Sequence, residues 1–269
     1  MKKFYYLIVA IITLHINVFS INDTLHVYYL ENFPYSYTEN KEVKGLEIDI
    51  IKEYVKWAKN DGVNLIIDYK VFSAFDKLFE AVSKAKDNVI GLGSVTIKPE
   101  RLKDVSFSPP YLKNVSILVT NTTVVQIQNK NEVTKTLAKQ RAVTLKNSVY
   151  EKFLLDIKKK YLPKLSISYT DSEFSAIDSV AAKPGVFAYC DILSYWTYGR
   201  NNKDKPLRIQ KFFTQDADNL GLIFPKRSNH EKGMSEFFES EFGFICSKQY
   251  TDILEKHLNH EVMETVKVN

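Results

Sequence analysis

The sequence predicts an α/β protein built in two lobes. Apolar strands alternate with amphipathic helices along the chain, a pattern typical of parallel or mixed sheets covered by helices. The alternation occurs once in the first half of the chain and again in the second, although the sequence itself does not repeat. With 269 residues, the chain is also long enough to build two separate cores.

The N-terminal segment, residues 1–20, has the pattern of a signal peptide. Two lysines precede an apolar run at 4–18, and the small residue Ser20 follows it. The alternative is a retained membrane anchor, but this apolar run is short for a membrane span and contains polar residues. We therefore expect cleavage near Ile21 and secretion of the remaining chain.

The first lobe is predicted from three strands and two helices. The strands are runs of β-branched and aromatic residues, and the helices carry apolar residues three and four positions apart. Gly45 breaks the chain before the first helix, and we expect Asp49 to cap that helix without touching a ligand. In order, the elements are a strand at 24–29, a helix at 49–59, a strand at 64–69, a helix at 75–86 and a strand at 89–95.

The second half of the chain shows the same alternation and predicts the second lobe. Its elements are a strand at 141–145, a helix at 149–161, a strand at 165–169, a helix at 173–182 and a strand at 185–190. A further strand at 221–224 and two helices at 231–242 and 251–266 complete the prediction.

Composition and motifs exclude several classes of function. The formal net charge is +5, and no basic stripe with interleaved aromatic residues is present, so we expect no nucleic-acid partner. The sequence contains no nucleophile elbow, no His-Glu-x-x-His, no phosphate-binding loop and no paired-cysteine metal spacing. We expect no catalytic residue, no cofactor and no metal site, and we interpret His257 and His260 as part of a solvated helix face. Secretion permits a disulfide between Cys190 and Cys246, but their spacing does not decide whether it forms.

Four segments together resemble the family 3 extracellular solute-binding proteins, the polar amino-acid receptors of ABC importers. The most specific one reads Thr96-Ile97-Lys98-Pro99-Glu100-Arg101, continued by Phe107-Ser108-Pro109-Pro110-Tyr111. The others are the helix entry at 45–50, the strand at 187–191 that ends in an aspartate, and the segment at 221–226. Their order and spacing extend the resemblance over essentially the whole secreted chain.

The resemblance implies a type II periplasmic-binding-protein fold, in which two hinge-linked sheets close on a ligand like a Venus flytrap. Residues 22–112 and 219–269 would form the first lobe and residues 113–218 the second. The hinge crossings would lie at about 111–115 and 216–220. The implied partners are an amino acid or close analogue and the membrane permease of an ABC importer. The protein would act as a monomer in the periplasm of a bacterium with two membranes.

A dry cleft must provide partners for both charges of an amino acid, because desolvation otherwise prevents binding. Arg101 can hold the α-carboxylate through two parallel hydrogen bonds, which a lysine cannot form. The resemblance implies that the backbone N–H and hydroxyl of Thr96 and the carbonyl of Ser94 line the same end. Asp191, from the facing lobe, would accept the α-ammonium group.

The resemblance also implies contacts with the rest of the ligand. Phe75 would form an apolar wall over the ligand side chain, and Asn32 and Phe33 lie in a loop that contacts the ligand in relatives. The turn before the predicted helix at 149–161 would offer backbone N–H groups from Ser148 and Val149 to the carboxylate.

The sequence departs from the family pattern at three positions. Lys98 stands where a threonine is usual, and Asn32 stands where an aromatic residue is common. Asn147 replaces the glycine of the turn that opens the second-lobe helix, although asparagine tolerates the left-handed backbone that such a turn needs. These departures leave a changed ligand class open.

Each of these assignments has an alternative. Arg101 could pair with Glu100 or Asp104 on the surface, Asp191 could be a helix cap, and Phe75 could belong to the core. The rival function is a periplasmic cyclohexadienyl dehydratase. Such enzymes resemble these binding proteins but carry a glutamate as general acid in place of the ammonium-binding aspartate. Because Asp191 is an aspartate, we favour binding. A sensor module would need a further domain after the second lobe.

Overall fold

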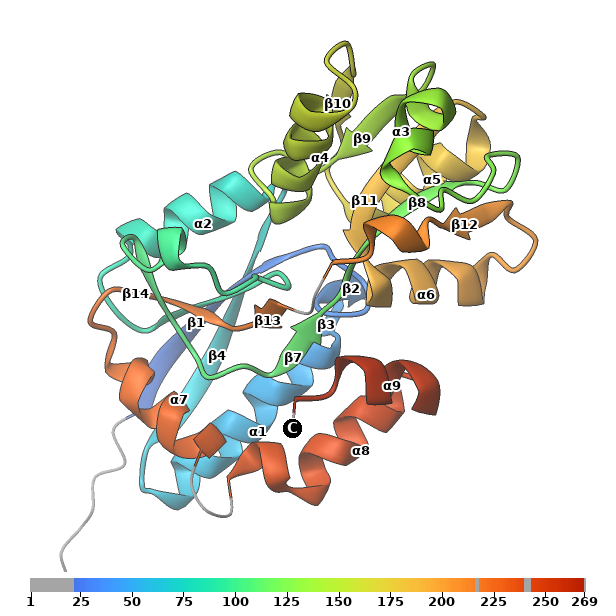
Figure 1. Ribbon diagram of the computed structural model, residues 1–269. Helices are drawn as coiled ribbons and strands as arrows, with labels where there is room; N and C mark the ends of the chain where they lie inside the picture. Colours follow the sequence, from blue (N-terminus) through green and yellow to red (C-terminus); the bar gives the residue numbers. More distant parts are fainter. Residues whose placement is uncertain (1–21, 216–217, 240–242, 269) are drawn as a thin grey trace, which may run out of the picture.

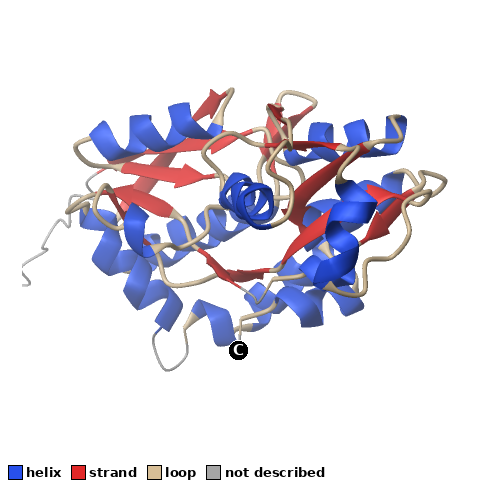
Figure 2. Ribbon diagram, turned by 45° about the horizontal axis from the view of Figure 1, so that its top comes forward, coloured by secondary structure: helices blue, strands red, loops and turns tan. Residues whose placement is uncertain are grey.

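The computed structural model describes residues 22–215, 218–239 and 243–268. The predicted signal peptide and two residues of the second predicted hinge crossing, at 216–217, lie outside the described residues. The described chain forms two mixed five-stranded sheets, and we call the part built on each sheet a lobe. Helices pack around both sheets, which lie side by side (Figures 1 and 2).

The first lobe is built on the sheet with strand order β4-β1-β5-β14-β6. Strand β1 pairs in parallel with β4 and with β5, whereas β14 runs antiparallel to β5 and to β6. Its strands are β1 (Asn22–Leu30), β4 (Asn64–Phe72), β5 (Val89–Leu92), β6 (Val105–Phe107) and β14 (Ile223–Pro225). Its helices are α1 (Leu46–Asn60), α2 (Phe75–Lys84), α7 (Asn229–Glu239), α8 (Lys248–His257) and α9 (His260–Val266). A small hairpin, β2 (Tyr37–Glu39) and β3 (Glu42–Lys44), precedes α1.

The second lobe is built on the sheet with strand order β10-β9-β11-β8-β12. Strand β9 pairs in parallel with β10 and β11, and β8 runs antiparallel to β11 and β12. Its strands are β8 (Ser116–Asn121), β9 (Arg141–Thr144), β10 (Ile167–Tyr169), β11 (Val186–Asp191) and β12 (Leu207–Ile209). Its helices are α3 (Lys130–Leu137), α4 (Val149–Lys160), α5 (Glu173–Ala182) and α6 (Ile192–Asn201). The predicted α/β class, with two mixed sheets, is therefore confirmed.

A two-stranded ribbon connects the lobes. Strand β7 (Leu112–Asn114) leads from the first lobe into β8, and β13 (Asp218–Leu220) pairs with β7 in antiparallel register on the way back to β14. In Figure 1 this ribbon lies between the two sheets. The core of the first lobe also receives side chains from the second, because Leu193 of α6 is buried in it and Trp196 packs against it.

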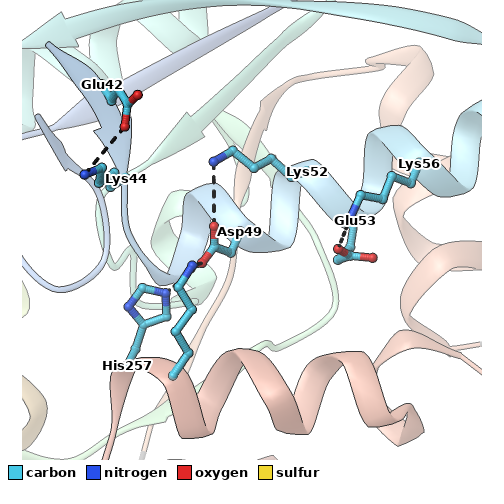
Figure 3. A network of polar contacts seen from close by, with 8 residues as sticks. Glu42, Lys44, Asp49, Lys52, Glu53, Lys56 and His257 are labelled. Carbon is cyan, nitrogen blue, oxygen red and sulfur yellow. Dashed lines mark hydrogen bonds and ion pairs between the residues drawn. The ribbon is translucent and has the colours of Figure 1, made fainter.

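The structure corrects the predicted role of Asp49. The N-terminal cap of α1 is Gly45, which makes no side-chain bond, and Asp49 lies one turn inside the helix. There its carboxylate accepts hydrogen bonds from Lys256 (2.6 Å) and His257 (2.8 Å) of α8, and Lys52 lies 3.7 Å away (Figure 3). Asp49 thus connects α1 to α8 through hydrogen bonds. The expectation that His257 belongs to a solvated face is wrong for the same reason, since its side chain is only 9% exposed.

The structure also answers two questions about the predicted C-terminal helix and the cysteines. The single helix predicted at 251–266 is two helices, because the side chain of Asn259 accepts a hydrogen bond from the backbone N–H of Val262 and caps α9. Cys190 is buried and Cys246 is exposed, and both are free, so they do not form a disulfide. None of the helices in the described ranges combines the length and the hydropathy that a membrane span requires.

Candidate ligand-binding site

A cavity lies between the lobes, where the carboxyl ends of parallel strands from both sheets meet. Ligands of open α/β sheets bind at such strand ends. The empty volume of the cavity is about 460 Å³, including its opening to solvent. From the first lobe it is lined by Leu30, Glu31, Asn32, Phe75, Gly93, Ser94, Thr96 and Arg101. From the second lobe it is lined by Leu145, Ser148, Val149, Tyr150, Asp171, Ser172 and Glu173.

Arg101 reaches this cavity from the short helical turn Pro99–Arg101, which follows β5. Its guanidinium donates a 2.9 Å hydrogen bond to the backbone carbonyl of Thr96 and lies over the ring of Phe75, 4.9 Å from the ring centroid. Burial lowers the pKa of Arg101. Within the described ranges no carboxylate forms an ion pair with it, and Glu100 pairs instead with Lys152 of the facing lobe. The alternative of a surface ion pair with Glu100 is therefore wrong.

A buried glutamate fixes the position of the segment at 93–96 through hydrogen bonds. Glu47 of α1 is fully buried and accepts hydrogen bonds from the backbone N–H of Ser94 (3.0 Å) and from the hydroxyl of Tyr111 (2.5 Å). Ser94 adopts a left-handed backbone, with φ of 49°. Burial raises the pKa of Glu47, although these hydrogen bonds work in the opposite direction. Glu47 belongs to the helix-entry segment at 45–50, but the sequence of that segment does not reveal this role.

Phe75 and Asn32 both line the cavity. Phe75 opens α2, is half-buried, and packs against Phe79 with ring centroids 5.8 Å apart. The amide nitrogen of Asn32 donates to the hydroxyl of Ser94 (2.9 Å), and its amide oxygen has no partner in the described part of the chain. Phe33 does not line the cavity; its ring packs edge-on against Phe174 of the second lobe, with centroids 5.8 Å apart.

The second lobe presents the N-terminus of α4 to the cavity. Ser148 is the cap of this helix, since its hydroxyl accepts a hydrogen bond from the backbone N–H of Glu151, and Val149 follows as the first helical residue. Asn147 has a φ of 60°, so the left-handed turn expected there is confirmed. Lys98 lies elsewhere: its ammonium group binds Asp218 of β13 at 2.5 Å, outside the cavity lining.

Asp191 does not line the cavity. It ends β11 and is 1% exposed, and its carboxylate accepts hydrogen bonds from the backbone N–H (2.6 Å) and hydroxyl (2.8 Å) of Ser194 and from the hydroxyl of Tyr35 (3.2 Å). It is therefore the cap of α6, as the structural alternative proposed. The carboxyl groups that line the cavity on this side are those of Asp171, in the loop after β10, and of Glu173, at the start of α5.

Glu173 and Asp191 form a buried pair of acids. The backbone N–H of Asp191 donates a 3.0 Å hydrogen bond to the carboxylate of Glu173. Burial, and then the charge of Asp191, raise the pKa of Glu173 well above its ordinary value. Burial and the neighbouring acid therefore both disfavour the ionised form of Glu173.

Sequence reasoning missed several of the lining residues, among them Tyr150, Asp171 and Glu173. Each lies in the second lobe just after the end of a strand or at the start of a helix, which is the available sequence signal. No sequence motif identifies these residues. The sequence alone does not distinguish a buried glutamate at the start of a helix from an exposed one. The described residues contain no cluster of side chains that could hold a metal ion.

Comparisons with known proteins agree with this geometry. Residues 25–258 match the model of the bacterial extracellular solute-binding proteins, family 3. No curated protein sequence matches significantly. Among solved structures, an ancestral arginine-binding protein bound to arginine is similar over 88% of this chain and 98% of its own, with 21% identity and a TM-score of 0.69.

Two other solved structures are similar to a comparable degree. The arginine-, lysine-, histidine-binding protein ArtJ from Geobacillus stearothermophilus is 20% identical, over 87% of this chain and 94% of its own, with a TM-score of 0.67. The ancestral amino acid-binding protein AncCDT-1, a precursor of cyclohexadienyl dehydratase, is 18% identical, over 88% of this chain and 96% of its own, also with a TM-score of 0.67. At these identities, the structures show a shared type II binding-protein fold.

Proposed function

Because the chain belongs to the bacterial extracellular solute-binding proteins of family 3, we propose that it captures an amino acid in the periplasm and delivers it to the permease of an ABC importer. The observation that carries this proposal is that the guanidinium of Arg101 has no acidic partner among the described residues. A partly buried guanidinium without an acidic partner is costly to the free protein. A ligand carboxylate supplies the missing partner through two parallel hydrogen bonds. Thr96 and the N-terminus of α4 offer further donors to the same carboxylate.

The remaining charges in the cavity favour a ligand that also carries a positive charge. Glu31, Asp171 and Glu173 line the cavity, and Arg101 is the one basic residue among its described lining residues. The unpartnered amide oxygen of Asn32 adds a further acceptor. An amino acid matches this arrangement, because its carboxylate binds the arginine and its ammonium group meets the acceptors.

One observation favours a second candidate function, that of a cyclohexadienyl dehydratase. Glu173 lines the cavity, and burial raises its pKa well above the ordinary value, which is the direction that a general acid requires. The charge of the cavity argues against this candidate. Prephenate carries two carboxylates and would meet one arginine and three acidic side chains, so it would lack a partner for its second charge.

A ligand screen of the secreted chain tests both candidates. The melting temperature is measured with each common L-amino acid and with prephenate, and prephenate conversion is followed by absorbance. We expect at least one amino acid to stabilise the protein, by about 2.7 kcal/mol at a concentration of about 100 times its dissociation constant. Turnover of prephenate without stabilisation by any amino acid would identify the protein as the enzyme instead.

We further propose that the lobes have the limits implied by the resemblance, residues 22–112 with 219–269 and residues 113–218, and that the ribbon of β7 and β13 is the hinge. Three contacts across the cavity support a ligand-stabilised closed form. They are the Tyr35–Asp191 hydrogen bond, the Phe33–Phe174 ring contact and the Glu100–Lys152 ion pair. Binding would shift the population towards this closed arrangement.

A further inference from the structure

We propose that Glu173, and not Asp191, receives the ammonium group of the bound amino acid, and that Asp191 acts as a positioning residue behind it. The inference rests on the proposed function and deepens it. The placement of the two acids carries it: Glu173 lines the cavity, whereas Asp191 does not.

The hydrogen bonds of Asp191 leave it little capacity for a ligand. One of its oxygens accepts from the backbone N–H of Ser194 and from Tyr35, and the other accepts from the hydroxyl of Ser194. These partners fix the carboxylate at the N-terminus of α6, where the helix dipole also favours its negative charge. To reach the cavity, Asp191 would have to give up its cap and leave these donors unsatisfied.

Glu173 is oriented by the same acid. Its carboxylate accepts a 3.0 Å hydrogen bond from the backbone N–H of Asp191. Ser172 caps α5 immediately before it, so the backbone that carries Glu173 is also fixed. A carboxyl group positioned in this way can accept a hydrogen bond from an ammonium group without rearrangement.

The charges around Glu173 couple ligand binding to the loss of a proton. The groups that face it are Asp191, Tyr35, Tyr150 and Cys190, and Arg101 lines the same cavity. Burial is the main cause that raises the pKa values of Tyr35, Tyr150 and Cys190, so these three groups stay neutral between pH 5.5 and 8. In the free protein, burial and the neighbouring Asp191 favour the protonated form of Glu173. A ligand ammonium group favours the ionised form of Glu173, so binding releases part of that proton.

The direction of the pH dependence follows from this linkage. Ligand binding selects the deprotonated form of Glu173, so affinity rises with pH until Glu173 ionises in the free protein as well. The rise is at most about tenfold per pH unit, the limit for one released proton.

The test uses calorimetry on the secreted chain, with the L-amino acid that gives the largest thermal shift as the probe. Titrations in phosphate and in Tris, whose ionisation enthalpies differ, measure proton release, and titrations from pH 5.5 to 8 measure the pH profile. Wild-type protein should release a fraction of a proton, and its affinity should rise with pH. Glu173→Gln should bind the probe at least about 30-fold more weakly, with no proton release and a flat profile.

Controls separate this role from a general effect on folding. Asp178→Asn makes the same replacement of an acid by its amide on the same helix, but Asp178 accepts from Tyr198 and lies outside the cavity lining, so its proton release should match wild type. The α-hydroxy analogue of the probe, which has no ammonium group, should bind Glu173→Gln and wild type alike. A wild-type titration without proton release, or a Glu173→Gln variant within threefold of wild-type affinity, overturns the inference. A protein that no L-amino acid stabilises overturns the proposed function itself.

Discussion

Phe75 contacts both the candidate ligand space and Arg101, so we expect it to determine which side chain the cavity accepts. Because the ring is half-buried and lies at the edge of the apolar core, Phe75→Ala should cost about 1–2 kcal/mol of folding free energy. The same substitution should change the rank order of amino-acid affinities, since the ring forms a flat wall of the cavity.

Phe79 provides a matched control for this prediction. It lies one turn further along α2, packs against Phe75 and does not line the cavity. Phe79→Ala should therefore lower the melting temperature by a similar amount and leave the ligand ranking unchanged. If Phe75→Ala preserves the ranking as well, Phe75 supports the core and does not select the ligand.

Sequence predicted the first-lobe half of the site better than the second-lobe half. Thr96 and Arg101 belong to a motif whose residue types and spacing are specific, and both line the cavity. Glu173 could not be identified in this way, because its burial depends on the packing of α5 against β11 and not on neighbours in sequence. Asp191 was recognised by motif, yet the motif does not reveal that its oxygens are already occupied by Ser194 and Tyr35.

At the scale of elements, Asp49 fixes α1 against α8. Burial raises the pKa of Asp49, but hydrogen bonds from His257 and Lys256 outweigh it and lower the pKa from 3.8 to about 2. A lowered pKa means that the ionised acid stabilises the fold above pH 3.8, and that this contribution is lost as pH falls towards 2. Asp49→Asn should therefore reduce the free energy of unfolding by roughly 2 kcal/mol at neutral pH.

Urea unfolding between pH 7 and pH 3 measures this effect. The difference between Asp49→Asn and wild type should stay constant down to about pH 4 and shrink below it. Asp252→Asn serves as the comparison, because Asp252 pairs with Lys248 on the exposed face of α8 and should contribute less than about 1 kcal/mol. Equal losses for the two variants would mean that the contact between α1 and α8 gives no special stabilisation.

The helices and strands that sequence predicted well are those long enough to show a period. Helix α5 begins and ends where predicted, and α4 differs by one residue. The three-residue strands β6, β7, β12 and β13 were not predicted, and neither was the six-residue strand β8. The polar helix α3 was also missed, because it buries only Val133 and Leu137. Helices α8 and α9 were merged because the apolar period continues across the cap at Asn259.

At the scale of the whole molecule, the contacts across the cavity predict a change of shape on binding. They come from loop and helix-end residues of both lobes and include one edge-on ring pair, Phe33 and Phe174. Without a ligand, the uncompensated charge of Arg101 disfavours the closed form. Small-angle scattering should therefore give a smaller radius of gyration with a saturating amino acid than without it. An unchanged radius with a ligand that raises the melting temperature would argue against hinge closure.

The central claim is that Arg101 binds the carboxylate of an amino acid between the lobes, and calorimetric comparison of wild type with Arg101→Ala tests it most directly. The variant removes a partly buried charge that has no acidic partner among the described residues, so its ligand-free melting temperature should equal or exceed that of wild type. The free energy of binding should become less favourable by about 3–5 kcal/mol for the amino acid that wild type binds most tightly, since the ligand carboxylate would be buried without its partner. An Arg101→Ala protein that binds this amino acid as tightly as wild type would contradict the account.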